Sequence, residues 1–213
     1  MTTLYPVFVK LAGQPCLVVG GGRVAGRKVR SLLEAGARVR VISPALADDL
    51  RELAAAGAIE YEPRGYRPGD VVGAMLVISA ADDPAVNRAV AEDCRARRIL
   101  LNAVDDPEHC SFYVPAALRR GDLTIAVSTG GKSPLLARKI RERLEAEFDP
   151  RYGDYLALIG EIRHNIIRNV TDPAEKEQLL EALVTPEILN ALANGDYDRV
   201  KELVDRVDHR GGP

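Results

Sequence analysis

The chain has 213 residues, 46% of them hydrophobic, which is enough for one large domain or two small ones. Its formal net charge of -2 provides no chain-wide positive field, so we expect no nucleic-acid partner. Cys16, Cys94 and Cys110 lack the paired spacing of a structural zinc site, which favours a reducing cytoplasm. No apolar run approaches the ~18 residues of a membrane span, and no export signal opens the chain, so we expect no membrane partner.

The first half of the chain alternates short apolar runs with segments of helical periodicity. The expected strands are 15–20, 37–42, 59–61, 75–78 and 99–102, and the expected helices are 23–36, 45–55 and 85–97. Alternation of this kind predicts a parallel, doubly wound α/β sheet.

Past Asp105 the pattern becomes antiparallel and then helical. Strand-like runs at 112–114 and 123–127, with a turn at 119–122, predict a hairpin or an edge extension. Ser133-Pro134 then predicts the start of a long amphipathic helix, whose apolar seam is Leu136, Ile140, Leu144 and Phe148. Everything after Tyr152 has helical spacing: a stripe from Leu156 to Ile166, then shorter helices at 179–184, 186–193 and 197–207.

A glycine-rich turn lies between the first expected strand and the first expected helix. The run Gly20-Gly21-Gly22-Arg23-Val24-Ala25 has the form GxGxxA. Its first glycine permits a tight turn, its second lets the backbone approach a pyrophosphate, and the small Ala25 lets the helix pack closely. Phosphate would then meet free N–H groups at the helix N-terminus. A plain flexible turn is the alternative, but the flanking strand and helix favour dinucleotide binding.

The second expected strand ends without the acidic residue that usually binds the ribose hydroxyls. It ends Ile42-Ser43-Pro44, and Ser43 could make a hydrogen bond to the ribose instead. Spacing alone therefore leaves the choice between NAD and NADP open.

Two groups of motifs, in the same order along the chain, resemble the precorrin-2 dehydrogenase and sirohydrochlorin ferrochelatase family, which includes the siroheme synthase N-terminal module. The first group is Tyr5-Pro-Val-Phe8, Lys10-Leu11, Cys16-Leu-Val-Val-Gly-Gly-Gly22, Val24-Ala25 and Arg27-Lys28. The second is Asn102-Ala-Val-Asp105, Ser111-Phe112, Pro115-Ala116, Ala126-Val-Ser-Thr-Gly-Gly131 and Ser133-Pro-Leu-Leu-Ala-Arg138. The resemblance covers about the first 150 residues closely.

The resemblance implies NAD-dependent dehydrogenation of precorrin-2 to sirohydrochlorin in siroheme biosynthesis. Some members also insert Fe²⁺ into sirohydrochlorin, and Fe²⁺ would be needed only for that step. The resemblance further implies a homodimer. It places the cofactor on Gly22, Arg23, Val24 and the run Ser43-Pro44-Ala45, and the catalytic aspartate at Asp105. The glycine motif adds Gly20 to the cofactor-binding residues.

Asp105 follows the fifth expected strand, at the edge of the sheet where ligands bind in open α/β folds. A carboxylate beside the substrate could take the proton that dehydrogenation releases, although Asp105-Asp106-Pro107 is also typical of a solvated turn. His109 is a weak candidate for a metal ligand, because a lone loop histidine is more often incidental. Cys110 is better interpreted as a small buried residue than as a nucleophile.

A loop before the long expected helix could bind the substrate carboxylates. It combines hydroxyls, glycines and a basic residue at the start of a helix, an arrangement that can bind anions. The candidates are Ser128, Thr129, Gly130, Lys132 and, in the helix itself, Arg138. A loop that only supports the helix is an equally good interpretation.

We therefore predict three parts: an NAD-binding Rossmann domain of residues 1–112, a dimerisation segment of 113–149 with a hairpin and a long helix, and an all-helical domain of 150–213. The apolar stripes of the last two parts also favour a homodimer. One alternative is a regulatory module that senses NAD and binds a partner through its helices. Another is a dehydrogenase for a different substrate, but Tyr152 and Tyr155 supply no Tyr-x-x-x-Lys pair.

Overall fold

A computed structural model describes the backbone of residues 4–211 and the side chains as far as residue 207. It divides into two units, Met1–Val114 and Pro115–Pro213. The predicted domain boundaries after residues 112 and 149 remain predictions. Within residues 4–211, no helix is both long enough and apolar enough to cross a membrane.

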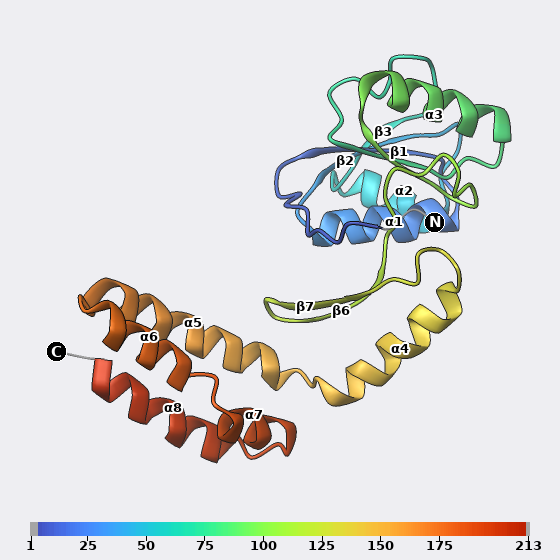
Figure 1. Ribbon diagram of the computed structural model, residues 1–213. Helices are drawn as coiled ribbons and strands as arrows, with labels where there is room; N and C mark the ends of the chain where they lie inside the picture. The colour runs from blue at the N-terminus through green and yellow to red at the C-terminus, as the bar shows by residue number, and fades with distance from the viewer. Residues whose placement is uncertain (1–3, 212–213) are drawn as a thin grey trace. The chain divides into compact units, whose positions relative to one another are not determined.

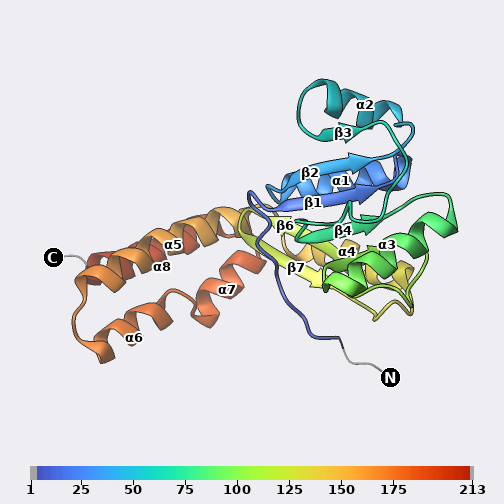
Figure 2. The ribbon, with the colours of Figure 1, turned by 90° about the horizontal axis from the view of Figure 1, so that it is seen from above.

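The first unit contains a five-stranded parallel sheet in the order β3-β2-β1-β4-β5. Figure 2 shows β3, β2, β1 and β4 side by side in that order. The strands are β1 (Pro15–Val19), β2 (Arg38–Ile42), β3 (Glu60–Glu62), β4 (Leu76–Ser79) and β5 (Leu100–Ala103). The order reverses between β1 and β4, which is where ligands bind in sheets of this type. The predicted Rossmann-type sheet is confirmed.

Helices cover both faces of this sheet. They are α1 (Arg23–Glu34), α2 (Asp48–Ala55) and α3 (Pro84–Arg97), and Figure 1 shows α1 and α2 on the face opposite α3. Val18 and Val41 point into the core with Val29 of α1, whereas Val77 and Leu101 point into the core with α3. Burial on both faces explains why the central strands β1 and β4 are nearly continuous apolar runs.

The prediction of a strand at residues 112–114 is wrong, because this segment forms no strand. Asn102 donates its side-chain amide to the carbonyl of Phe112 at 3.1 Å, and the N–H groups of Ser111 and Phe112 donate to the carbonyl of Leu101. These bonds fix the segment beside β5, and Pro115 has no N–H to donate to a ladder. The hairpin begins one residue later, with β6 (Ala116–Arg120) antiparallel to β7 (Leu123–Val127), and only Gly121 and Asp122 form its turn.

The rest of the second unit is helical, as predicted. Its helices are α4 (Pro134–Glu147), α5 (Arg151–Asn169), α6 (Pro173–Ala182), α7 (Pro186–Ala193) and α8 (Tyr197–Gly211). The hydroxyl of Ser133 caps α4 by accepting from the N–H of Leu136, and Asp172 and Thr185 cap α6 and α7 in the same way. Figure 1 shows α5, α6, α7 and α8 gathered around one core, which includes Ile166, Ile188 and Val204.

The hairpin, α4 and α5 are tied together around one arginine and one glycine. Arg120 of β6 donates to the carbonyl of Phe148 at 2.7 Å and to the carbonyl of Glu145 at 3.3 Å, both at the C-terminal end of α4. Gly153 of α5 lies so close to this strand that an added Cβ would come within 2.7 Å of the Arg120 carbonyl carbon. The expected helix after residue 150 is therefore anchored directly on the hairpin.

Candidate dinucleotide site

The glycine turn lies at the point where the strand order of the sheet reverses. Gly20 donates its N–H to the carbonyl of Ile42 in β2, and Ala80, just after β4, donates to the carbonyl of Val19. Gly20 has a φ of +122°, and a Cβ there would overlap the Ala80 carbonyl. Only glycine fits both conditions. The first glycine of the motif is thus a steric requirement of the fold.

Gly21 is a second requirement that the motif alone did not single out. A Cβ on this residue would overlap the carbonyl oxygen of Ala45 and lie 2.7 Å from the Ser43 hydroxyl. Its own carbonyl accepts the N–H of Ala47 at 2.7 Å. The segment after β2 is therefore closed onto the glycine turn. The only sequence signal for this contact was that the variable position between the two motif glycines is also a glycine.

Gly22 differs from both neighbours because a Cβ there would project into open space. It is the N-cap of α1 with φ −83° and ψ −176°, has no side chain to cap the helix, and no acidic residue follows in the first turn. The first N–H groups of a helix have no intrahelical partner and attract anions. Exposed Arg23 and half-buried Val24 form the start of this helix. The residues present therefore fit a pyrophosphate group at this position.

The run Ser43-Pro44-Ala45 is placed beside the turn, but Ser43 is already engaged. Its buried hydroxyl donates to the carbonyl of Ala45 at 2.7 Å, and its carbonyl accepts the hydroxyl of Tyr61 at 3.1 Å. The hydroxyl oxygen of Ser43 can therefore only accept a hydrogen bond from a ribose. Pro44 and Ala45 are exposed, so the backbone here is the accessible surface.

Asp105 lies in an exposed turn directly after β5. Its φ of +59° is uncommon for a residue with a side chain, and such conformations are concentrated at functional sites. No described side chain or backbone group, as far as residue 207, makes a hydrogen bond or ion pair with its carboxylate. The structure therefore provides a solvent-accessible, unpaired carboxylate at the ligand-binding edge of the sheet.

The neighbouring acid is paired. The imidazole Nδ1 of His109 lies 2.7 Å from a carboxylate oxygen of Asp106, and this hydrogen bond holds the pKa of Asp106 below its usual range. The half-buried Cys110 thiol donates to the carbonyl of Ala103 at 3.2 Å, and burial raises its pKa. Within residues 4–207, no group of three or more His, Cys, Asp or Glu side chains is arranged to hold a metal ion. The role of His109 as an iron ligand stays a prediction.

The candidate substrate loop uses its hydroxyls internally. Gly130 donates its N–H to the Ser128 hydroxyl at 3.2 Å, and Ser133 donates its N–H to the Thr129 hydroxyl at 3.1 Å. Lys132 donates its N–H to the Thr129 carbonyl, so the loop is a compact turn. Arg138 pairs with Glu142 at 2.8 Å on the exposed face of α4. The proposed contacts of these residues with substrate stay predictions.

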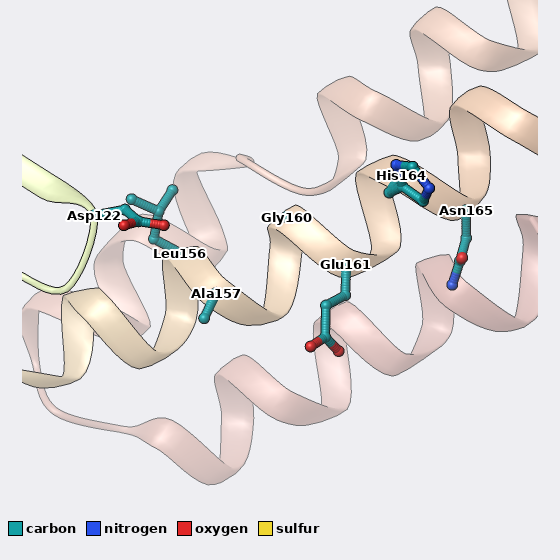
Figure 3. A pocket seen from close by; sticks show the side chains of 7 residues that line it. All are labelled: Asp122, Leu156, Ala157, Gly160, Glu161, His164 and Asn165. Carbon is teal, nitrogen blue, oxygen red and sulfur yellow. The ribbon is translucent and has the colours of Figure 1, made fainter. Parts of the chain in front are cut away.

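Two further hollows were not anticipated from the sequence. One, with a volume of about 650 Å³, is lined by Asp122 of the hairpin turn and by residues of α5 as far as Asn165. Figure 3 shows that His164 points away from Glu161 and Asn165. Its polar groups therefore do not converge. The other, of about 670 Å³, lies at the amino ends of β1 to β4, at the edge of the sheet opposite the glycine turn.

Two protein families match consecutive segments of the chain. Residues 7–116 match a family described as putative NAD(P)-binding, which is more than half of the chain. Residues 120–147 match the family described as sirohaem biosynthesis protein central. The first match contains the glycine turn and Asp105, and the second contains the Ser128 loop and all of α4.

Relatives of known sequence and structure agree with these matches. The siroheme synthases of Thioalkalivibrio sulfidiphilus and Chromobacterium violaceum are 41% and 39% identical over 97% and 98% of this chain. The chain spans only 42% and 44% of their lengths. The solved structure of SirC, a precorrin-2 dehydrogenase, is 28% identical with a TM-score of 0.79, covering 97% of this chain and all of SirC. The chain therefore belongs to the putative NAD(P)-binding family, and it is similar to siroheme synthases and to SirC along nearly its whole length.

Proposed function

We propose that the chain is an NAD-dependent dehydrogenase that converts precorrin-2 to sirohydrochlorin in siroheme biosynthesis. The observation that supports this most is that the likeness to SirC extends over 97% of this chain and all of SirC, so both units have counterparts in a protein named for this activity. A Rossmann domain alone would support only cofactor binding. An NAD-sensing regulatory module is less favoured, because it gives no reason for an unpaired carboxylate at the ligand-binding edge.

In this proposal the glycine turn and Asp105 have separate tasks. Gly20 keeps the turn tight, the backbone of Gly22, Arg23 and Val24 holds the pyrophosphate, and the segment after Ser43 borders the adenosine ribose. The bound dinucleotide supplies the hydride acceptor. Asp105 takes the proton that leaves the substrate carbon skeleton, so that one hydride and one proton are removed and a double bond forms.

The proposed substrate has many carboxylates and needs basic partners. Lys132 and Arg138 are candidates in the second unit, together with the hydroxyls of Ser128 and Thr129 and the backbone of Gly130. Iron insertion would be a second reaction with Fe²⁺ as substrate. We expect dehydrogenation to be the main activity, because no described group of side chains within residues 4–207 is arranged to hold Fe²⁺ in waiting.

We also propose that the protein is a cytoplasmic homodimer that pairs through α4. Leu135, Leu136 and Ile140 are 66%, 52% and 38% exposed, and Ala137 is the only buried residue among those of α4, all of which are described. An exposed apolar stripe of this kind is typical of a protein interface. A second copy could cover it with the same residues in a two-fold arrangement.

The test of the proposed function is an anaerobic reaction of the full chain with precorrin-2 and either NAD or NADP. We expect the sirohydrochlorin absorption spectrum to develop with NAD, faster than in a protein-free control. No protein-dependent conversion with either cofactor would contradict the proposal. A clear preference for NADP would correct only the cofactor.

A further inference from the structure

One cation on the helix that follows the glycine turn has no partner among the described side chains. Lys28 lies on α1, one helical turn after Val24 and on the same face, and it is half-buried. None of the side chains described, as far as residue 207, makes a hydrogen bond or ion pair with its ammonium group. On the same helix, Arg30 pairs with Asp49 at 2.5 Å. Lys28 is therefore an unpaired charge on a helix whose other cations are paired or exposed.

The surroundings of Lys28 place it beside the loop that follows Asp105. Its ammonium is close enough to the Cys110 thiol for each group to affect the pKa of the other. That thiol is fixed by the backbone of Ala103 and Asp106. Val104 and Phe112, at the two ends of this loop, pack against the same core as Ala25 and Val29 of α1. The helix that carries Lys28 is therefore packed next to the loop after β5. Burial, together with the charge of Arg27, lowers the pKa of Lys28.

Partial burial of an unpaired ammonium costs free energy, and an anion that binds it offsets this cost. A lysine ammonium is a compact charge with three donors on a flexible stem, which suits single carboxylates in variable positions. The simpler alternative is that the aliphatic stem of Lys28 only covers apolar surface, with its charge directed to solvent. The two possibilities differ in what happens when the charge alone is removed.

We propose that Lys28 is a substrate-binding residue that pairs with a carboxylate of the anionic tetrapyrrole. This assignment rests on the proposed function and adds a residue in the first unit to the candidates in the second. It implies that carboxylate recognition begins on α1 itself, next to the cofactor.

The experiment compares Lys28→Met with the matched variant Arg30→Met, which removes one cation from the same helix. Binding of uroporphyrin, a stable tetrapyrrole with eight carboxylates, is followed by fluorescence titration, and NAD binding by calorimetry. For Lys28→Met we expect the Kd for the tetrapyrrole and the KM for precorrin-2 to rise about tenfold or more, the range for losing a charge-assisted hydrogen bond. The Kd for NAD and the Tm should stay near their wild-type values, and Lys28→Arg should restore much of the affinity.

Tetrapyrrole affinity in Lys28→Met equal to that of wild type and Arg30→Met would overturn the assignment. So would a lowered Tm with equal losses of NAD and tetrapyrrole binding, because that pattern indicates a structural role. Because the binding assay requires no turnover, it tests the role of Lys28 independently of the proposed dehydrogenase activity. Lys28-dependent binding without oxidation of precorrin-2 contradicts only the proposed function, whereas turnover unaffected by Lys28→Met contradicts only the role of Lys28.

Discussion

At the scale of single residues, the three glycines of the turn have different steric requirements. Gly20 and Gly21 cannot accept a Cβ, because the carbonyls of Ala80 and Ala45 occupy the space. Gly22 can accept one without touching any described atom within 4 Å. The described fold therefore does not require Gly22 to lack a side chain, and the free space beside it fits a ligand.

We predict that Gly22→Asp abolishes NAD binding while the protein stays folded. The new carboxylate would fill the space of the pyrophosphate and repel it, but the backbone angles of Gly22 suit any residue. Calorimetric titration measures the affinity, and thermal unfolding measures the stability. Gly20→Ala is the contrast, because it should lower the Tm through the clash at Ala80. Unchanged NAD affinity in folded Gly22→Asp would remove the glycine turn from the site.

We predict that Asp105→Asn lowers turnover by on the order of 10²-fold or more with little change in Tm or NAD affinity. An amide keeps the shape and tolerates the left-handed backbone, but it cannot take a proton. Stopped-flow turnover at saturating substrate is the measurement. Asp106→Asn is the matched control, since its carboxylate is paired with His109. Wild-type turnover in Asp105→Asn would support the solvated-turn interpretation instead.

The sequence allowed the positions of the glycine turn and Asp105 to be predicted, because both depend on short spacing next to recognisable strands. It did not reveal that Ser43 donates to Ala45 or that His109 pairs with Asp106. These pairs depend on the exact path of irregular loops, which no periodicity encodes. The sequence also could not predict that Lys28 has no partner among the described side chains. Helical spacing on α1 does not indicate which side chains the loop after β5 brings near it.

At the scale of elements, the parallel sheet was predictable because its buried strands are apolar runs closed by glycines. The hairpin was misplaced because β6 begins with two alanines, which are poor strand formers, whereas Phe112-Tyr-Val114 has strong strand propensity. Pairing of Ala116 with Val127 overrides that local preference. The contacts of Arg120 with the end of α4 also required the fold, because no spacing in the sequence relates Arg120 to Glu145 and Phe148.

Two glycines of α5 give a matched test of how this helix is anchored. We predict that Gly153→Ala destabilises the protein by roughly 1–3 kcal/mol, because the new methyl group would press on the backbone of Arg120 and Gly121. Gly160→Ala should instead stabilise it by about 0.5–1 kcal/mol, because nothing lies within 4 Å and alanine favours helix. Urea unfolding measures both free energies. Equal effects of the two substitutions would contradict close packing of α5 on the hairpin.

At the scale of the whole molecule, α4 is the element whose burial is least complete. We predict a dimer at micromolar concentration that Ile140→Glu disrupts, because a charge in the centre of the apolar stripe would be buried without a partner. Sedimentation velocity measures the assembly. Arg163→Glu on α5 is the control, because Arg163 is exposed and lies outside α4. A wild-type protein that sediments as a monomer would count directly against the dimer.

The measurement that tests the central claim most directly follows NADH and sirohydrochlorin together in one anaerobic reaction of the full chain with precorrin-2 and NAD. A dehydrogenase that removes one hydride and one proton must form the two products in equal amounts. The account predicts equal amounts, formed at a rate proportional to protein concentration, with both signals lost in Gly22→Asp and greatly slowed in Asp105→Asn. Sirohydrochlorin formation at the protein-free rate, or without matching NADH, would contradict it.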